Sequence, residues 1–243
     1  MLEVRSLSKL FGGFPALTDV SFDVAKGEIL GLIGPNGSGK TTLFNCIAGA
    51  LPAASGSIRF EGREVVGLTP DRICALGLAR TFQIPRPFRK LSILENVMLA
   101  AYYGSGTPVR EGEARARARQ ALELVGLPAD GGGRPGLLGA AGLKKLELAR
   151  ALATGPRLLL ADESLGGLDP DEMRQAADSL LRIRTEMRIT IVWVEHIMAA
   201  LMRVVDRVMV LDHGEKIAEG SPRAVAEDPR VVEAYLGERI ALG

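Results

Sequence analysis

A glycine-rich stretch lies between a strand-like segment and a helical pattern. Residues 34–41 read GPNGSGKT, which matches the phosphate-loop pattern G-x-x-x-x-G-K-[S/T], and they directly follow the apolar segment EILGLI. Glycines let such a loop curl so that successive backbone N–H groups converge on an anion, and the following helix adds its positive end. The alternative is a glycine-rich turn, but a chance match in a chain this long is only about a one-percent event. The sequence therefore predicts a phosphate-binding loop.

Each side chain of this loop has an expected task. Lys40 would place a point charge on the β- and γ-phosphates of a nucleotide, and Thr41 would offer its hydroxyl to Mg²⁺. ATP and Mg²⁺ are therefore the expected cofactors. The predicted nucleotide contacts are Gly34, Pro35, Asn36, Gly37, Ser38, Gly39, Lys40, Thr41 and Thr42.

Composition excludes several other classes of protein. The chain has 243 residues, of which 47% are hydrophobic and 24% are charged, and this balance is ordinary for globular proteins. Lys and Arg number 30 against 29 Asp and Glu, so charge alone argues against nucleic-acid binding. Two cysteines, Cys46 and Cys74, are too few for a disulfide framework and favour small core residues in a reducing compartment.

No segment is expected to cross a membrane. The nearest apolar stretch, residues 189–211, is interrupted by Glu195, His196, Arg203, Asp206 and Arg207. The first residues, MLEVRSLSK, lack the basic region and apolar core of a signal peptide. These patterns predict a soluble cytoplasmic protein.

Short apolar segments alternate with longer helical patterns, which predicts an α/β protein with a mostly parallel sheet. The segments LLLA and TIVWV are continuously apolar, as is typical of strands covered on both faces. Hairpin-length gaps at residues 12–13 and 25–27 indicate that the early strands form an antiparallel addition. The predicted strands are 2–6, 20–24, 29–33, 57–60, 158–161, 189–194, 208–211 and 216–219.

Helical periodicity dominates the middle of the chain. From about residue 70 to 153 nearly every pattern is helical, whereas strands dominate on both sides. We predict one domain, residues 1–243, in which a P-loop NTPase core (1–83 and 154–243) carries an inserted helical subdomain at about 84–153. The predicted helices are 40–48, 70–75, 94–101, 109–125, 143–153 and 170–185, with short helices after Pro222 and Pro229.

A second acidic element belongs to the same chemistry. The apolar segment 158–161 ends in Asp162 and Glu163. In P-loop ATPases the first such acid orients Mg²⁺, and the second can polarise the attacking water. Two acids at a strand end could instead cap the next helix. With the phosphate loop upstream, Asp162 is the predicted metal ligand and Glu163 the predicted catalytic base.

Together these motifs resemble the ATP-binding subunits of ABC transporters, over essentially the whole chain and in family order, with residues 34–41 as the Walker A motif. The resemblance implies that Phe11 stacks on adenine and that Gln83, in Arg80-Thr81-Phe82-Gln83, reaches the metal and the attacking water. It also implies that Asp169 runs along a dimer seam and that His196 contacts the γ-phosphate. The catalytic set is then Glu163, His196, Gln83 and Lys40, and the metal set is Thr41, Gln83 and Asp162.

The chain departs from the family at its signature, L-S-G-G-Q. The corresponding positions are Leu138, Gly139, Ala140, Ala141 and Gly142, of which only the first matches. In this family the signature of one subunit completes the ATP site of another, and its serine and backbone amides bind the γ-phosphate. Losing one such charged hydrogen bond should cost roughly 1.5–3 kcal/mol. We therefore expect this chain to hydrolyse ATP with its own loop when another subunit supplies a signature.

Four further segments resemble the branched-chain amino-acid importer ATPases: RTFQIPRPF at 80–88, EHIM at 195–198, GEKIAEG at 214–220 and VVEAYLG at 231–237. That resemblance implies two permeases, a second ATPase subunit in a heterodimer, a periplasmic or extracellular binding protein, and a position on the inner face of the membrane. No nucleic-acid partner is expected. Branched-chain amino acids are the implied cargo, and urea or short amides remain alternatives.

Three functions stay open from the sequence. The first is a transport ATPase subunit. The second is a non-transport ABC protein acting on nucleic acid or ribosomes, although such proteins usually fuse two cassettes. The third is a low-turnover nucleotide-binding scaffold, which the altered signature suggests and the retained Glu163 and His196 oppose.

Overall fold

The computed structural model describes every residue except 131, 163–169, 196–200 and 241–243. Its contacts divide the chain into two compact units, Met1–Thr69 with Thr190–Gly243, and Pro70–Ile189. We describe each unit by itself. The proposed boundaries of the helical subdomain, about 84–153, stay a prediction.

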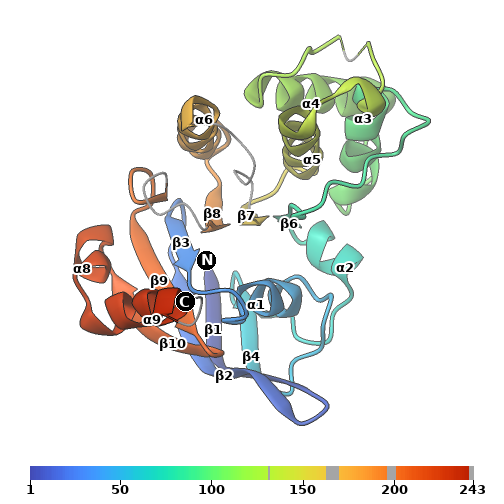
Figure 1. Cartoon of the computed structure of the whole chain (residues 1–243). Coiled ribbons are helices and arrows are strands. Elements are labelled where there is room, and N and C mark those ends of the chain that lie inside the picture. The colour runs from blue at the N-terminus through green and yellow to red at the C-terminus, as the bar shows by residue number, and fades with distance from the viewer. Residues whose placement is uncertain (131, 163–169, 196–200, 241–243) are drawn as a thin grey trace. The chain divides into compact units, whose positions relative to one another are not determined.

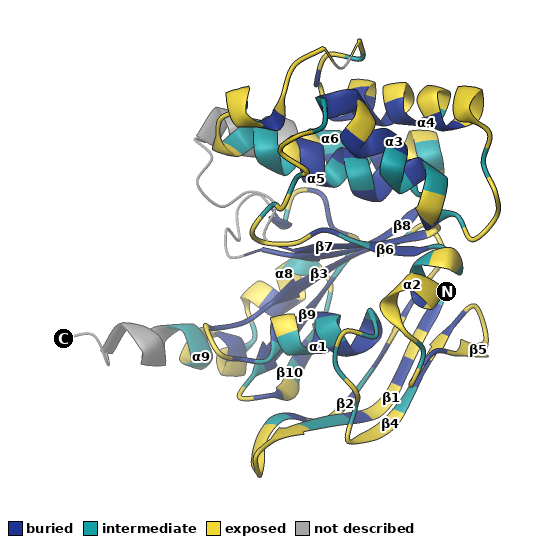
Figure 2. Ribbon diagram, turned by 90° about the vertical axis from the view of Figure 1, so that its right-hand side faces the viewer, coloured by how far each residue is buried: buried dark blue, intermediate teal, exposed yellow. Residues whose placement is uncertain are grey.

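The first unit contains a parallel sheet that carries the phosphate loop. Strand β3 (Ile29–Ile33) lies between β8 (Thr190–Val194) and β9 (Arg207–Asp212) and runs parallel to both. Strand β10 (Glu215–Gly220) adds to β9 in antiparallel fashion. Every residue of β3 and β8 is buried (Figure 2), which explains why their sequences do not alternate. Helix α1 (Lys40–Ile47) begins where the loop after β3 ends (Figure 1).

A second, antiparallel sheet completes this unit. Its strands stand in the order β2-β1-β4-β5, with bounds Phe14–Val24, Leu2–Phe11, Ser55–Phe60 and Arg63–Glu64. The turn at Gly12-Gly13 joins β1 to β2 as expected. The expected hairpin at 25–27 is wrong, because that turn leads from β2 into β3 of the other sheet. All five residues of β3 are apolar or glycine. Such a strand is stable where both of its faces are buried, and the parallel sheet buries both faces of β3.

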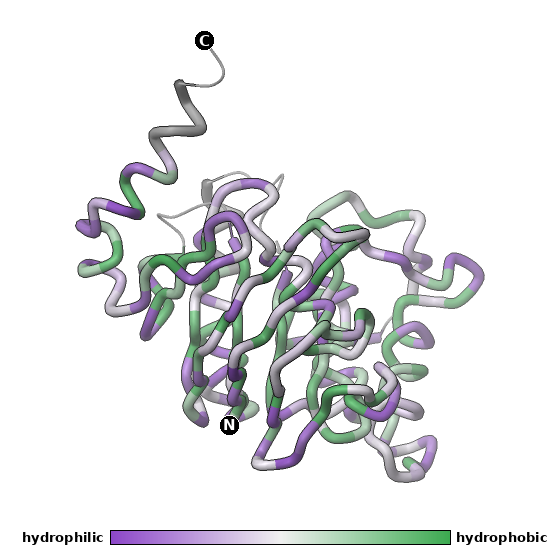
Figure 3. Tube along the Cα trace, turned by 90° about the horizontal axis from the view of Figure 1, so that it is seen from below, coloured by the Kyte–Doolittle hydropathy of each residue, from purple (hydrophilic) through white to green (hydrophobic). Residues whose placement is uncertain are grey.

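Two C-terminal helices follow β10, both starting at a proline as predicted. Helix α8 (Pro222–Ala226) begins after Ser221, whose hydroxyl accepts a hydrogen bond from the Ala224 N–H at 3.3 Å. Helix α9 (Pro229–Ile240) buries Val231 and exposes Glu233, and its first turns carry both hydrophilic and hydrophobic residues (Figure 3).

The second unit combines a strand pair with a helical bundle. Strands β6 (Leu78–Arg80) and β7 (Leu158–Asp162) run parallel. Helices α3 (Ile93–Gly104), α4 (Glu111–Leu124) and α5 (Ala140–Ala153) pack against one another, and α4 contributes the buried small residues Ala114, Ala118 and Ala121. Helices α2 (Pro70–Ala75) and α6 (Pro170–Met187) also belong to this unit.

The predicted α/β class is confirmed, although several elements differ in their bounds or were not predicted. Helix α5 begins at Ala140 rather than Leu143, because two alanines, the strongest helix formers, extend its first turn. Strands β5 and β6, of two and three residues, were not predicted, since such short segments carry no periodicity. Among the helices that the structure describes, none is long and apolar enough to span a membrane.

Candidate nucleotide-binding site

The phosphate loop has a backbone that requires glycine. Gly34, Gly37 and Gly39 have φ angles of 151°, 78° and 103°, which L-residues with a side chain rarely adopt. A Cβ on Gly34 would lie 2.0 Å from the Leu211 carbonyl oxygen, and one on Gly39 would lie 2.8 Å from the Ala16 carbonyl oxygen. The loop is therefore packed against its own unit and held in one curved conformation.

Two alanine substitutions separate packing from backbone strain. Gly34→Ala should destabilise the protein by more than about 3 kcal/mol, because the new methyl group collides with fixed backbone at Leu211. Gly37→Ala is the matched control: it shares a positive φ but meets nothing within 4 Å. It should cost only about 1 kcal/mol. Chemical denaturation measures both changes, and equal losses would contradict the packing argument.

Lys40 is the cation of the loop and is 5% exposed. Its Nζ donates to the carbonyl oxygens of Gly34 and Pro35, at 2.8 and 2.7 Å, and lies 3.3 Å from the Ser38 hydroxyl oxygen. These contacts fold the long side chain back over the loop instead of into solvent. A phosphate bound by the N–H groups of the loop would therefore lie beside the Lys40 ammonium group.

Two threonine hydroxyl groups at the start of α1 lie next to the phosphate loop. Thr41 is exposed and Thr42 is half-buried, and both lie in the first turn, where helix N–H groups have no partner inside the helix. Oxygen donors of this kind, together with carboxylates and phosphates, are what Mg²⁺ prefers in proteins. The residues present therefore fit a magnesium nucleotide.

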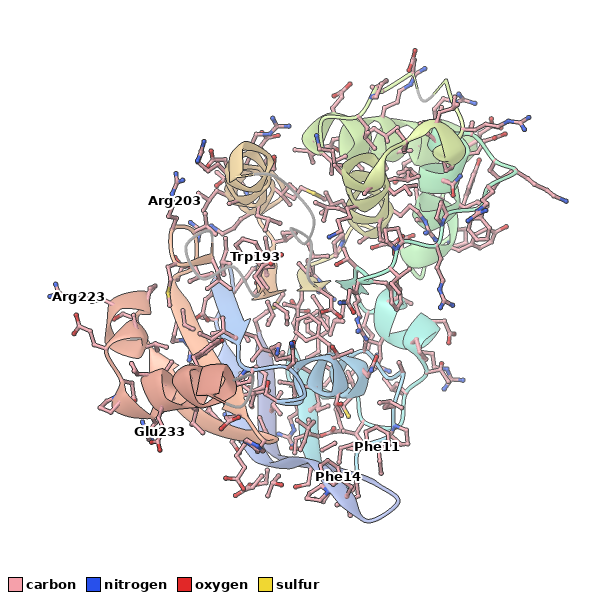
Figure 4. The ribbon with its side chains drawn as sticks, viewed as in Figure 1. Phe11, Phe14, Trp193, Arg203, Arg223 and Glu233 are labelled. Atoms are coloured by element: carbon pink, nitrogen blue, oxygen red, sulfur yellow. The ribbon has the colours of Figure 1, made fainter. Side chains whose placement is uncertain are left out.

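Phe11 ends β1, at the tip of the hairpin where it faces Phe14 across the strands (Figure 4). Phe11 is 46% exposed, and Lys9 Nζ lies 5.0 Å from its ring centroid. An exposed aromatic face of this kind is available for stacking, and Phe14 offers a second one at 71% exposure. Adenine stacking by Phe11 stays a prediction.

A hollow of about 580 Å³ borders the phosphate loop. Pro35, Asn36 and Gly37 form one wall, and the turn between β9 and β10 forms another with Asp212 and His213. Arg230 and Glu233 of α9 complete it, and Figure 4 shows Glu233 on that helix. The C-terminal segment therefore contributes directly to the surroundings of the loop.

The second unit contains two predicted metal ligands, Asp162 and Gln83, and we call the segment that follows β6 and carries Gln83 the Q-loop. Asp162 ends β7 and is 2% exposed, and the exposed Gln83 follows the neighbouring strand β6. Sequence reasoning missed the residue that holds this carboxylate: Arg80 Nη2 donates to Asp162 Oδ2 at 2.9 Å. The basic residue directly before Thr81-Phe82-Gln83 was the available signal, but its strand was too short to predict.

The signature positions lie at the start of α5. Gly139 is the N-cap residue and provides no side-chain hydrogen bond to the helix, and Ala140, Ala141 and Gly142 form the first turn. A serine at residue 139 would occupy the position where hydroxyl groups cap helices. A Cβ at Gly142 would lie 3.1 Å from the Leu138 side chain, so any larger residue there requires Leu138 to shift.

Three predicted site residues, Glu163, Asp169 and His196, lie outside the described residues. Their roles stay predictions from the sequence.

Comparison with known proteins agrees with this site. The family model described as ABC transporter matches residues 17–166, and the model described as branched-chain amino acid ATP-binding cassette transporter matches residues 215–241. The chain is 34% identical over 250 residues to the high-affinity branched-chain amino acid transport ATP-binding protein BraF of Pseudomonas aeruginosa, with 98% of each chain covered. It is 36% identical over 246 residues to the probable branched-chain amino acid transport ATP-binding protein LivG of Archaeoglobus fulgidus, covering 98% of this chain and 95% of the relative.

A solved structure gives the same result. The crystal structure of a nucleotide-free ATP-binding cassette from an ABC transporter superposes with a TM-score of 0.87 at 31% identity, and the match covers 97% of this chain and 98% of that one. The phosphate loop, the fold and the length of the match agree. The chain therefore belongs to the ABC transporter family, among its ATP-binding cassettes.

Proposed function

We propose that this protein is the ATP-hydrolysing subunit of an ABC importer for branched-chain amino acids or related small polar solutes. The observation that carries the proposal is the phosphate loop, built as a rigid glycine cradle around the buried Lys40. Relatives along nearly the full length are named as branched-chain amino acid transport ATP-binding proteins. The match of residues 215–241 to the branched-chain model supports the same cargo.

The chain's own residues divide the work. The loop N–H groups and Lys40 would bind the phosphates, Phe11 would stack on adenine, and Glu163 would accept a proton from the attacking water. Thr41, Asp162 and Gln83 would hold Mg²⁺, which neutralises phosphate charge when it is bound. His196 would contact the γ-phosphate, and Asp169 would line the seam with a second ATPase subunit.

The proposed location is the inner face of the membrane, through permease subunits. Residues that follow Gln83 are suited to such a contact: Ile84 and Phe88 are 69% and 51% exposed, so Phe88 is not part of the core. Arg150 Cζ lies 5.4 Å from the Phe88 ring centroid. This apolar surface flanked by cations would fit a short cytoplasmic helix of a permease.

The backbone beneath this surface is fixed. Asn96 is fully buried on α3, and its amide accepts from the Phe88 N–H at 2.8 Å and donates to the Phe88 carbonyl at 3.1 Å. The same amide also donates to the Ser92 carbonyl at 2.8 Å. Phe88 is therefore presented on a loop whose course the bundle determines.

Engineered cysteines test this contact. In a chain with Cys46→Ala and Cys74→Ala, single cysteines at residues 86–90 should crosslink to the permease in assembled transporter. Arg119→Cys, on the exposed face of α4 in the same unit, is the control and should crosslink poorly. Efficient crosslinking at residue 119 with none at 86–90 would contradict the proposed docking surface.

Reconstitution tests the function itself. Permeases, a second ATPase subunit and this chain in proteoliposomes should take up labelled leucine, isoleucine or valine only with ATP and the binding protein. ATP hydrolysis without uptake of any of these, or of urea and short amides, would contradict the importer assignment.

The altered signature favours one second candidate, a low-turnover scaffold. Gly139 carries no hydroxyl at the N-cap of α5, so this chain offers a poor signature to a partner's site. Normal turnover by the assembled pair that depends on Glu163 would exclude the scaffold.

A further inference from the structure

A buried ion pair joins the ends of strands β6 and β7. The strands are in register, with Arg80 beside Leu160, and Arg80 Nη2 donates to Asp162 Oδ2 at 2.9 Å. The side chains of Arg80 and Asp162 are only 7% and 2% exposed. Arginine is rarely buried this deeply unless its charge is compensated. The pair is therefore a built feature of this strand end and not a surface contact.

Thr81 holds the main chain of the same strand end. Its N–H donates to the Leu160 carbonyl at 3.0 Å, and its hydroxyl oxygen accepts from the Asp162 N–H at 2.9 Å. Both the main chain and the side chain of Asp162 are thus anchored by Arg80 and Thr81. These two residues directly precede Phe82 and Gln83, at the root of the Q-loop.

The Phe82 ring provides a second contact for the Arg80 guanidinium. Arg80 Cζ lies 5.3 Å from the centroid of the Phe82 ring. A planar guanidinium directs its N–H groups along set lines, whereas an ammonium on a flexible stem does not. Held between Phe82 and Asp162, Arg80 can fix the rotation of the carboxylate as well as compensate its charge.

We propose that Arg80 is a positioning residue for the metal step: by holding Asp162 Oδ2, it fixes the rotation of the carboxylate that would ligate Mg²⁺. This inference rests on the proposed function, in which Asp162 is a metal ligand. Mutation of a partner that orients a metal-ligating side chain typically costs about 10- to 100-fold in metal affinity or activity. Any movement at the root of the Q-loop would then change how well the site holds its metal.

If Arg80 instead competed with the metal for Asp162, the opposite effect on metal binding would be expected. Arg80 and a metal ion are both cations, so an arginine that only paired with the carboxylate would compete with the metal for it. Weakening the Arg80–Asp162 ion pair would then tighten metal binding. The contacts from Thr81 and Phe82 favour positioning, because they place the pair in a frame that does not depend on the metal.

Manganese binding tests the inference. In the Glu163→Gln chain, Mn²⁺ affinity in the presence of ATP is measured by electron paramagnetic resonance, and metal-free ATP affinity is measured with a fluorescent analogue in chelator. Arg80→Lys should weaken Mn²⁺ binding about 10-fold or more and leave metal-free ATP affinity unchanged. Arg157→Lys is the matched control, because Arg157 Nη2 bonds to the Leu76 carbonyl at 2.6 Å and links the opposite end of the same strand pair.

The results for these variants support or overturn the positioning role of Arg80. Unchanged or tighter Mn²⁺ binding by a folded Arg80→Lys chain would overturn the inference, as would an equal loss in Arg157→Lys. If Arg80→Lys does not fold, Thr81→Val and Thr81→Ser replace it. Weaker Mn²⁺ binding by Thr81→Val, together with wild-type Mn²⁺ affinity in Thr81→Ser, supports the positioning role. Any other result for this pair overturns the inference. Asp162→Asn separates the two proposals, since unchanged Mn²⁺ affinity there would contradict the metal role of Asp162 itself.

Discussion

Lys40→Ala is expected to weaken ATP binding by about 100-fold or more, whereas Glu163→Gln is expected to leave binding intact and to stop turnover. Lys40 neutralises phosphate in the ground state, and each hydrogen bond to a charged group contributes about 1.5–3 kcal/mol. A carboxylate that acts on water contributes only as the bond breaks, so its loss should lower kcat by about 10²- to 10⁴-fold. Equilibrium binding and steady-state hydrolysis measure the two effects separately.

Lys40 also bonds to the carbonyls of its own loop, so the binding loss needs a structural control. Unfolding curves of Lys40→Ala show whether the loop has collapsed. Lys26→Ala, which removes an exposed cation in the same unit, should leave both binding and turnover unchanged. Wild-type turnover by Glu163→Gln would remove that carboxylate from the mechanism, and loss of binding would assign it a structural duty.

This chain alone is expected to dimerise poorly with ATP and to turn over slowly, and a partner with an intact signature is expected to rescue one site. In a homodimer both sites would lack the signature hydroxyl, and one missing bond to the γ-phosphate lowers the rate by about 10- to 150-fold at 1.5–3 kcal/mol. The rescued site would hold this chain's Lys40 and Glu163. Glu163→Gln in this chain should then remove most activity, and the equivalent change in the partner should remove little.

Restoring the signature is the complementary experiment. Gly139→Ser, Ala140→Gly and Ala141→Gly together should raise hydrolysis at the second site. The N-cap position of residue 139 places a serine hydroxyl at the helix start, and its effect on stability should be only a few tenths of a kcal/mol. Gly142 is best left unchanged, because a side chain there meets Leu138. Vigorous, cooperative hydrolysis by the purified chain alone would falsify the asymmetry.

Local patterns were enough to predict much of this protein. Residues 29–33 and 158–161 are continuously apolar, and the structure confirms buried parallel strands there. The phosphate loop could be read directly, because its chemistry needs glycines and a lysine at fixed spacing within one short segment. The starts of α2, α8 and α9 follow from prolines that fit the first turn of a helix.

Contacts between distant residues were decided only by the tertiary structure. Residues 25–27 look like a hairpin turn locally, yet β3 leaves β2 because only the parallel sheet covers both its faces. Strand β6 exists because β7 supplies its hydrogen bonds, since three residues carry no pattern of their own. Arg80 meets Asp162 across 82 positions of sequence, and the Leu211 carbonyl oxygen requires glycine at residue 34. The sequence determined which groups do chemistry, because those are named by residue type and local spacing. The tertiary structure decided what holds them, because hydrogen bonds and packing depend on which segments become neighbours.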